Sequence, residues 1–304
     1  MLTFLHPHFS NLEKNIPDAE IVRFEKFSDG WPRIFLTDKE NLRGKEVTYI
    51  GDFRYVEDFF GQLAFLDGLS RYHIDMLHIH IPFFPAASME RDTPSWELSI
   101  ANVFARTLGL VGERNAWCVH IHLYDIHDER EIFYFPPSLQ IHHHTTTDIL
   151  KTLPLLGGAG GGTPPNLPYE GRDMKPIILF PDAWAKKAFS RFFEDYEVVT
   201  CAKVRKSPTE IEMYFEWGNL EGREVLIVDD HIRSGGTLVE ACRYAREKWA
   251  RSVSAFAPHA VFAEWVKESF LSAFDHFYTT DTIPMNIERF AGNEKVKVLS
   301  FWSL

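Results

Sequence analysis

The segment VLIVDDHIRSGGTLVEA, residues 225–241, holds the residues with the clearest chemistry. A run of apolar residues leads into Asp229 and Asp230, and a Ser-Gly-Gly-Thr turn then opens a helix. Two carboxylates at the carboxyl end of a strand can hold ribose hydroxyls, directly or through Mg²⁺. Glycines allow successive N–H groups and the helix N-terminus to converge on a phosphate. The segment therefore predicts a site for a phosphorylated ribose.

Within this segment we assign the acidic pair to the sugar and the turn to the phosphate. The phosphate residues are Ser234, Gly235, Gly236 and Thr237. Asp-Asp and Gly-Gly are also common in ordinary acidic turns. The coincidence of acidic pair, glycines and helix start favours the ligand site. Two enzyme families share this pattern, so the segment alone leaves the choice between them open.

Basic and imidazole side chains elsewhere are less specific candidates. Lys203 and Arg205 point to the same side if the end of their strand stays extended, yet such a pair is typical of a solvated surface. His127 follows another expected strand, where a histidine is more often structural. We interpret the histidines at 142–144 as loop residues, because three adjacent histidines cannot all face one ion on regular structure.

The elements that must position these residues follow from the periodicity of the sequence. Short apolar runs alternate with helical patterns, which predicts an α/β fold with a parallel sheet and crossover helices. The expected strands are 46–51, 76–84, 116–125, 175–180, 197–204, 223–230, 253–259 and 276–281. The expected helices are 54–71, 95–108, 183–194, 237–249 and 261–273. Gly and Pro dominate 153–173, which we interpret as a linker, because its GGAGGG run lacks the Gly-Lys-Ser/Thr ending of a P-loop.

Composition restricts the class of partner. A chain of 304 residues is about twice the usual domain size, so we expect two domains, 1–150 and 151–304. The formal charge of −11, without a dense Lys/Arg run, disfavours nucleic acid. No stretch approaches the ~20 apolar residues of a membrane span, and the three cysteines are scattered. These features predict a cytoplasmic protein without a membrane partner.

Motifs along nearly the whole chain resemble those of the ribose-phosphate diphosphokinases, or PRPP synthetases, in the order of that family. Phosphoribosyltransferases share the sugar-phosphate loop but are usually shorter, single-domain proteins. The segments that carry the resemblance are FSDGWP (27–32), NLRGKEV (41–47), PFFPAASMERD (82–92), LYDIHDE (123–129), FPDAWAK (180–186), AKVRK (202–206), VLIVDDHIRSGGTLVEA (225–241) and TTDTIP (279–284). The DGWPRIFL, SMER and SGGT stretches are more similar to the plant-type class II enzymes than to the common bacterial type.

The resemblance implies two Rossmann-like, type I phosphoribosyltransferase-like domains with mostly parallel central sheets. The N-terminal domain would bind the nucleotide, and the C-terminal domain would carry the ribose 5-phosphate loop, with about 20 final residues returning to the first domain. It also implies transfer of the diphosphoryl group of Mg²⁺-ATP, or of another nucleoside triphosphate, to O1 of ribose 5-phosphate. The implied products are phosphoribosyl diphosphate (PRPP) and AMP. Independence of free phosphate and a homo-oligomer follow from the same resemblance.

The resemblance also assigns roles to single residues. Lys203, Arg205 and His127 are implied to be catalytic, since positioned cations and donors stabilise the charge that builds on phosphate oxygens. His127 and Asp182 occupy positions at which the family holds magnesium, and Asp125 lies beside His127. The implied nucleotide contacts are Phe27, Asp29, Arg91 and His127.

One departure from the family pattern keeps two alternatives in view. Bacterial-type enzymes carry an acidic residue where this chain has Arg233, and a guanidinium there would favour additional negative charge on the acceptor. The acceptor could then be a larger ribose 5-phosphate derivative such as ADP-ribose. The other alternative is a non-catalytic, PRPP-synthetase-like regulatory subunit. Such a subunit should have lost the catalytic cations or the acidic pair, and this chain retains both, which favours an enzyme.

Overall fold

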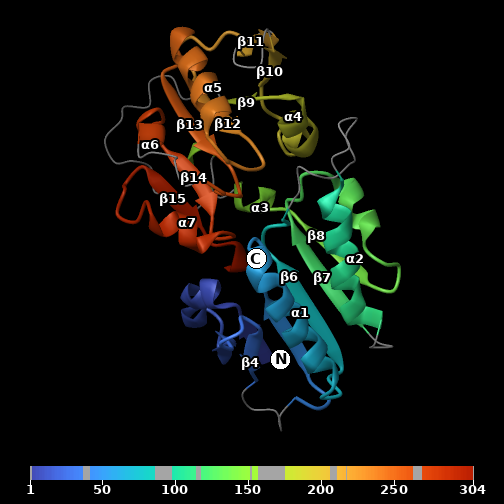
Figure 1. The fold of residues 1–304 in the computed structure, drawn as a ribbon. Coiled ribbons are helices and arrows are strands. Elements are labelled where there is room, and N and C mark those ends of the chain that lie inside the picture. Colours follow the sequence, from blue (N-terminus) through green and yellow to red (C-terminus); the bar gives the residue numbers. More distant parts are fainter. Residues whose placement is uncertain are drawn as a thin grey trace. The chain divides into compact units, whose positions relative to one another are not determined.

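The chain consists of two compact units, each built around its own sheet (Figure 1). The computed structural model describes residues 2–36, 42–85, 98–113, 118–150, 153–156, 175–205, 211–216, 218–262 and 269–303. The units are Met1–His144 and Thr145–Leu304, so the division falls close to the expected boundary at 150. Nearly all neighbouring strands are parallel, and helices pack on them, which confirms the α/β class. In the described part of the chain, no helix is long and apolar enough to cross a membrane.

The first unit contains a six-stranded parallel sheet with strand order β2-β1-β5-β6-β7-β8. Its strands are β1 (Leu2–Leu5), β2 (Ala19–Ile21), β5 (Glu46–Ile50), β6 (Met76–Ile81), β7 (Val119–Tyr124) and β8 (Gln140–His144). The helices are η1 (Pro7–Lys14), α1 (Val56–Ser70), α2 (Ile100–Glu113) and η3 (Glu129–Tyr134). A separate antiparallel hairpin joins β3 (Arg23–Lys26) to β4 (Pro32–Phe35). The sequence patterns had not predicted β1 to β4.

The two faces of the first sheet differ in chemistry. Strand β6 reads MLHIHI and β7 reads VHIHLY, so apolar residues alternate with histidines. Successive side chains of a strand point to opposite faces. The apolar set, including Ile79 and Ile121, packs with Leu66 of α1 and Phe104 of α2 into one core. Figure 1 shows both helices lying across the same sheet. The other face of β6 and β7 therefore carries the histidines.

The interpretation of residues 142–144 as a loop is wrong. These histidines are the last residues of β8, which pairs with β7 in parallel and places His122 opposite His142 and Tyr124 opposite His144. The backbone groups of this segment form hydrogen bonds with β7, so the segment is an extended edge strand and not a loop. Because a strand alternates its faces, His142 and His144 share one side of the sheet, while His143 points to the other.

The second unit contains a seven-stranded sheet with strand order β11-β10-β9-β12-β13-β14-β15, in which β10 and β11 pair antiparallel. Its strands are β9 (Ile177–Phe180), β10 (Val198–Arg205), β11 (Ile211–Glu216), β12 (Glu224–Val228), β13 (Ser252–Phe256), β14 (Phe277–Thr280) and β15 (Val296–Leu299). The helices are α3 (Thr147–Leu150), η4 (Pro154–Leu156), α4 (Ala183–Phe189), η5 (Ser190–Phe192), α5 (Gly236–Glu247), α6 (Ser269–Ser272), α7 (Pro284–Glu288) and η6 (Phe301–Ser303).

Both faces of the second sheet are apolar. On β12, Val225 and Ile227 pack with α5 in one core, whereas Leu226 and Val228 pack with α4 in another. A strand buried on both faces reads as a continuous apolar run, which is why VLIV and IILF were recognisable as strands. This double burial makes β12 a rigid support for the residues that follow it.

The second unit differs from expectation at its ends. At the end of the chain β15 pairs with β14, and the Phe301 N–H donates to Asp281 at 2.9 Å, while the expected packing of the last residues on the first unit stays a prediction. Strand β11 had not been predicted. The expected helix 261–273 is shorter, since residues 261–262 are not helical and α6 begins at Ser269, with 263–268 outside the described residues. Most of the expected linker, including GGAGGG, also lies outside them.

Candidate active site

The acidic pair lies at the carboxyl end of the central strand β12. Asp229 donates its N–H to the Phe256 carbonyl at 3.0 Å, which continues the pairing of β12 with β13 for one residue. The Asp230 N–H then donates to the Asp229 carboxylate at 3.0 Å. Asp229 is partly exposed, whereas Asp230 is buried. The turn after β12 therefore holds both carboxyl groups in place, at the edge of the sheet where its parallel strands end.

Negative charge is concentrated at this strand end. Burial raises the pKa of Asp229 well above its ordinary value, and the charges of Asp230 and Asp182 raise it further. A hard cation with oxygen ligands, or hydroxyls that donate to the carboxylates, would relieve this unfavourable interaction. The donor set of this unit consequently fits Mg²⁺ or the hydroxyls of a sugar.

The predicted phosphate loop has an uncapped helix start. Gly235 is the N-cap of α5 in the left-handed conformation, with φ of 75°, and it has no side chain to cap the first turn. A Cβ on Gly235 would lie 2.5 Å from Phe270, so the backbone must remain glycine here. The Gly236 N–H has only a long contact, 3.4 Å, with the Ser234 hydroxyl. Orphan N–H groups at a helix N-terminus are a ready anion site.

Asp182 follows β9, the neighbour of β12, and is the N-cap of α4. One carboxylate oxygen accepts from the N–H groups of Trp184 and Ala185, both at 2.9 Å. This capping role is structural and was not predicted. Its charge nevertheless influences Asp229, which places Asp182 at the same end of the same sheet. The magnesium role proposed for Asp182 stays a prediction.

Lys203 and Arg205 lie on β10, opposite Met213 and Ile211 of β11. The sequence analysis had ended this strand at 204, and the antiparallel pairing with β11 extends it to Arg205. The segment 206–210, which connects the two strands, lies outside the described residues. The backbone thus places both cations two positions apart at one strand end, as predicted, and their catalytic role stays a prediction.

His127 lies in the first unit, in a tightly held turn after β7. Asp125 is buried with a left-handed φ of 40°, and its N–H donates to the His144 carbonyl at 3.0 Å. Asp128 is also buried and caps η3, accepting from the Arg130 N–H at 3.1 Å. A non-glycine residue at positive φ in a turn that carries a candidate residue is typical of functional sites.

The tip of the β3–β4 hairpin exposes the predicted base-binding residues. Phe27 is 53% exposed and Trp31 is 60% exposed, which is unusual for large aromatic side chains. The Asp29 carboxylate accepts from the Trp31 N–H at 3.3 Å, so part of its bonding capacity stabilises the turn. Arg91, the remaining predicted nucleotide contact, lies outside the described residues.

His231 was missed by the sequence analysis, although it directly follows the acidic pair. Its backbone N–H donates to one Asp230 oxygen at 2.8 Å, and its ring Nδ1 lies 2.9 Å from the same oxygen. Since an ionised carboxylate only accepts, Nδ1 carries the proton in that contact. The imidazole thereby holds the Asp230 carboxylate in one orientation. Only the adjacency of His231 to the pair could have indicated this role.

A second cluster, the imidazole face, lies on β6, β7 and β8. We use this name for the ring-bearing residues that share one side of these strands: His78, His80, His120, His122, Tyr124, His142 and His144. The rings of His80 and His122 stack with centroids 4.2 Å apart. Hydrogen bonds of 2.9 and 2.8 Å join His122 to His78 and His144. Burial and neighbouring imidazoles lower the pKa of His122 to about 3.

Comparison with known proteins decides the family. Ribose-phosphate pyrophosphokinase 4 of Oryza sativa subsp. japonica is 30% identical over 288 residues, which cover 92% of this chain and 84% of that protein. The chain belongs to the ribose-phosphate pyrophosphokinase family. The protein of the same name from Arabidopsis thaliana is 29% identical over 290 residues, covering 92% of this chain and 81% of that protein. A scan against models of protein families found no match.

Other members of the pyrophosphokinase family agree with this assignment. The enzyme of Pyrococcus abyssi is 28% identical over 88% of this chain and 86% of its own length. Phosphoribosylpyrophosphate synthetase of Mycobacterium smegmatis shares the fold, with a TM-score of 0.76, 19% identity and coverage of 98% of this chain and 94% of that one. The plant relatives confirm the plant-type resemblance. The names of these relatives support the synthetase reading and give no support to a larger acceptor or a regulatory subunit.

Proposed function

We propose that this pyrophosphokinase transfers the diphosphoryl group of Mg²⁺-bound ATP to O1 of ribose 5-phosphate, giving PRPP and AMP. The observation that carries the proposal is the end of β12, where Asp229 and Asp230 precede a helix start that no side chain caps. That arrangement offers hydroxyl acceptors and phosphate donors in the order that a ribose 5-phosphate presents them. Family membership supplies the reaction.

The acidic pair is assigned to the sugar hydroxyls and magnesium. Burial, and then the charges of Asp230 and Asp182, raise the pKa of Asp229, and a bound cation stabilises the ionised carboxylate. His231 contacts one oxygen of Asp230 through its backbone N–H and its ring, which holds that carboxylate in place beside Asp229. Mg²⁺, when bound, neutralises charge on the phosphates during transfer.

The loop from Ser234 to Thr237 is assigned to the 5-phosphate. Gly235 and Gly236 let the backbone N–H groups approach the phosphate oxygens, and the N-terminus of α5 adds the favourable end of its dipole. The Thr237 hydroxyl is a further donor at the same helix start. These contacts hold the pentose so that O1 can attack the β-phosphorus of the triphosphate.

Lys203 and Arg205 are assigned to stabilise the negative charge that develops on the transferred group. The attack of O1 on the β-phosphorus breaks the bond between the α and β phosphates and leaves negative charge on AMP and on the diphosphoryl oxygens. Fixed cations stabilise such charge as it develops. His127 and Arg91 are proposed to contact the nucleotide, and His127 with Asp182 is proposed to hold a metal ion.

The hairpin tip of Phe27 and Asp29 is proposed to bind the base of the nucleotide. An exposed aromatic ring offers a stacking surface, and a carboxylate accepts from an amino group. We propose a homo-oligomer in which this hairpin contributes to the active site of a neighbouring subunit. We also propose that nucleoside triphosphates other than ATP can act as donors. A cytoplasmic location stays a prediction, because some relatives are named chloroplastic or mitochondrial.

The direct test is an assay of the purified chain with Mg²⁺, ATP and ribose 5-phosphate, in which AMP and PRPP are quantified with and without inorganic phosphate. We expect equal amounts of AMP and PRPP, and activity without free phosphate. Formation of AMP without PRPP, or no turnover under either condition, would contradict the proposal.

Substitution of the proposed catalytic cation gives the sharper result. We expect Lys203→Ala to lower kcat by about 10²–10³-fold, because it removes charge stabilisation in the transition state. Lys248→Ala is the matched control, since Lys248 is exposed at the opposite end of α5. Equal activity of both variants would remove Lys203 from the mechanism, and circular dichroism should show both folded.

A further inference from the structure

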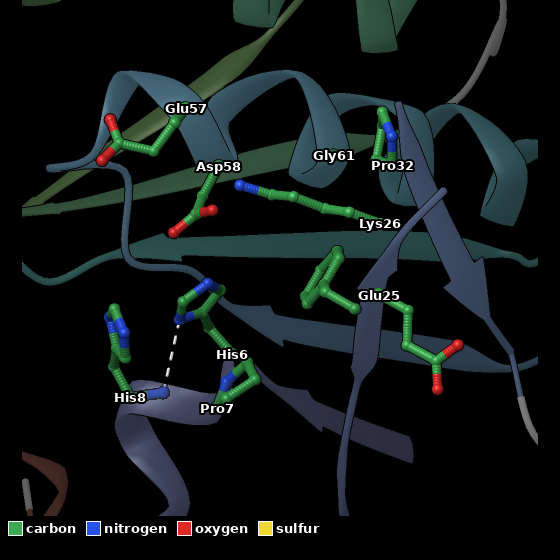
Figure 2. A pocket seen from close by; sticks show the side chains of 10 residues that line it. His6, Pro7, His8, Glu25, Lys26, Pro32, Glu57, Asp58 and Gly61 are labelled. Atoms are coloured by element: carbon green, nitrogen blue, oxygen red, sulfur yellow. Dashed lines mark hydrogen bonds between the residues drawn. The ribbon is translucent and has the colours of Figure 1, made fainter. Parts of the chain in front are cut away.

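A pocket in the first unit carries metal-ligating side chains that the proposed reaction does not use. The pocket has a volume of about 340 Å³ and is lined in part by His6 and His8 (Figure 2). His6 follows β1, and Asp52 follows β5. These strands are parallel neighbours with Leu5 opposite Ile50, so their carboxyl ends bring the two segments together. One ligand atom from each of His6, His8 and Asp52 lies within 4.8 Å of the others.

We propose that His6 and His8 bind a borderline divalent cation of the Zn²⁺ class, with Asp52 as the carboxylate that orients His8. Imidazole nitrogens are common ligands of such cations in proteins. Mg²⁺ prefers oxygen ligands, so the imidazoles distinguish this site from the acidic strand end of the second unit.

The contact between His8 and Asp52 prepares His8 as a ligand. Their Nδ1 and Oδ2 atoms lie 2.7 Å apart. The Arg54 guanidinium pairs with the Asp52 carboxylate, which therefore accepts the hydrogen bond from His8. This places the proton on Nδ1 and leaves the Nε2 lone pair of His8 for a metal. Carboxylate-oriented histidines of this kind are typical of metal sites.

Arg54 shows why Asp52 orients rather than ligates. Its guanidinium donates to both carboxylate oxygens, at 2.7 and 2.5 Å, and its backbone N–H donates at 3.2 Å. Together with His8, these donors fill the acceptor sites of Asp52. The Gln62 side chain also donates to the Asp52 carbonyl at 2.7 Å. The carboxylate is therefore immobile, as a support for a ligand must be.

His6 supplies the second nitrogen. It is only 4% exposed. Its Nδ1 accepts from the His8 N–H at 3.3 Å, a long contact that a metal could replace at small cost. The rings of His6 and His8 have centroids 4.6 Å apart, which keeps the two donors adjacent.

The pocket walls favour a cation. Glu57 and Asp58 of α1 line the pocket together with the ammonium of Lys26, whereas the Glu25 carboxylate is paired with Arg23 and Arg33. Figure 2 shows Asp58 on the α1 side of the pocket, facing His6. A carboxylate in this position, or water, can complete the coordination shell.

The test uses the untagged full chain after removal of metals with a chelator. Zn²⁺ is titrated in metal-buffered solution and bound metal is measured per chain, and Co²⁺ serves as a spectroscopic substitute for nitrogen ligation. We expect one tightly bound Zn²⁺ per chain and a d–d absorption of Co²⁺ that Zn²⁺ removes. Absence of tight Zn²⁺ binding by the unaltered protein would overturn the proposal.

The variants locate the site. His6→Asn keeps an N-cap acceptor for η1 but removes the imidazole, and His8→Gln removes the second ligand. Each should weaken Zn²⁺ binding at least about tenfold, and Asp52→Asn should weaken it by about 10–100-fold through misorientation of His8. His122→Ala is the control, because the imidazole face is the competing cluster. Loss of binding in His122→Ala, or unchanged binding in His6→Asn and His8→Gln, would overturn the assignment.

Discussion

The sheets of the two units use their faces differently. The second sheet buries apolar side chains on both faces of β9 and β12, whereas the first buries them on one face and carries the imidazole face on the other. The same parallel topology therefore supports a fully apolar layer in one unit and a polar aromatic surface in the other. The comparison shows that strand pairing alone does not decide the chemistry of a sheet face.

The two units also differ in the sign of their expected pH response. In the first, the imidazole face has lowered pKa values, so protonation opposes folding below the ordinary pKa of about 6.5. In the second, the pKa values of Asp229 and Asp281 are raised, chiefly by burial, so protonation favours the folded state. Stability rises with pH wherever the unfolded chain binds more protons. Acid should therefore weaken the first unit while the second gains from its buried carboxyl groups.

The largest effect is expected from a substitution that leaves a cavity in the apolar layer of the second sheet. Leu226 of β12 is completely buried, and Leu226→Ala should lower the free energy of unfolding of that unit by about 2–5 kcal/mol, because it leaves a cavity. Hydrogen exchange of the amides in β9, β12 and β13 measures the stability of the second unit separately from that of the first.

Its counterpart on the imidazole face is His122→Ala. This side chain is only partly buried, so at pH 8 we expect a loss below about 1 kcal/mol. Equal losses at Leu226 and His122 would mean that the imidazole face is as tightly packed as the apolar core, which would remove the contrast between the sheets.

The next effect sharpens the difference in pH response. Between pH 7.5 and pH 5 we expect the first unit to lose about 2–4 kcal/mol, a range reduced from the ideal linkage value because several of the rings are partly exposed. The groups concerned are His78, His80, His120, His122 and His144. The protection factors of the amides in β6 and β7, which correct for the slower intrinsic exchange in acid, should fall, while those in β12 should not.

A variant tests the origin of that acid response. His122→Gln removes the central ring, which bonds to both His78 and His144, and should reduce the dependence on pH. An unchanged acid response in this variant would assign the effect to groups outside the imidazole face.

The last prediction concerns the loop that follows strand β12. Gly235→Ala forces a left-handed φ on a residue with a Cβ and brings that atom against Phe270, so we expect a loss of about 1–3 kcal/mol. The same change should raise the KM for ribose 5-phosphate, because the N–H groups of the turn must shift. Gly222→Ala is the control, since Gly222 also has positive φ but has nothing within 4 Å of its added Cβ. Identical KM values for ribose 5-phosphate in both variants would show that this loop does not bind the phosphate.

Much of the fold could be predicted because its strands are either continuously apolar or flanked by helical periodicity. Strands β9, β12 and β13 and helices α1 and α5 were located close to their observed positions. Strands β1, β8, β11 and β15 were not predicted, since short edge segments and a run of histidines lack that signal. Their pairing depends on neighbours distant in sequence.

The candidate site divides in the same way. Asp229, Asp230 and the glycine turn could be predicted, because strand, acidic pair and helix start are contiguous in the chain. The capping role of Asp182 and the contact of His231 with Asp230 could not, because they depend on which acceptors remain after the backbone has folded. The roles of Lys203, Arg205 and His127 rest on family resemblance.

By itself, the amino-acid sequence determined the α/β class, the glycine turn after the acidic pair and the family, because each depends on local residue order. Only the tertiary structure brought His6 and His8 to Asp52, and joined histidines of β6, β7 and β8 into one face. Adjacent parallel strands align residues that lie 44 positions apart in the chain, such as His8 and Asp52. No pattern along the sequence encodes that proximity, since it arises from the register of the sheet.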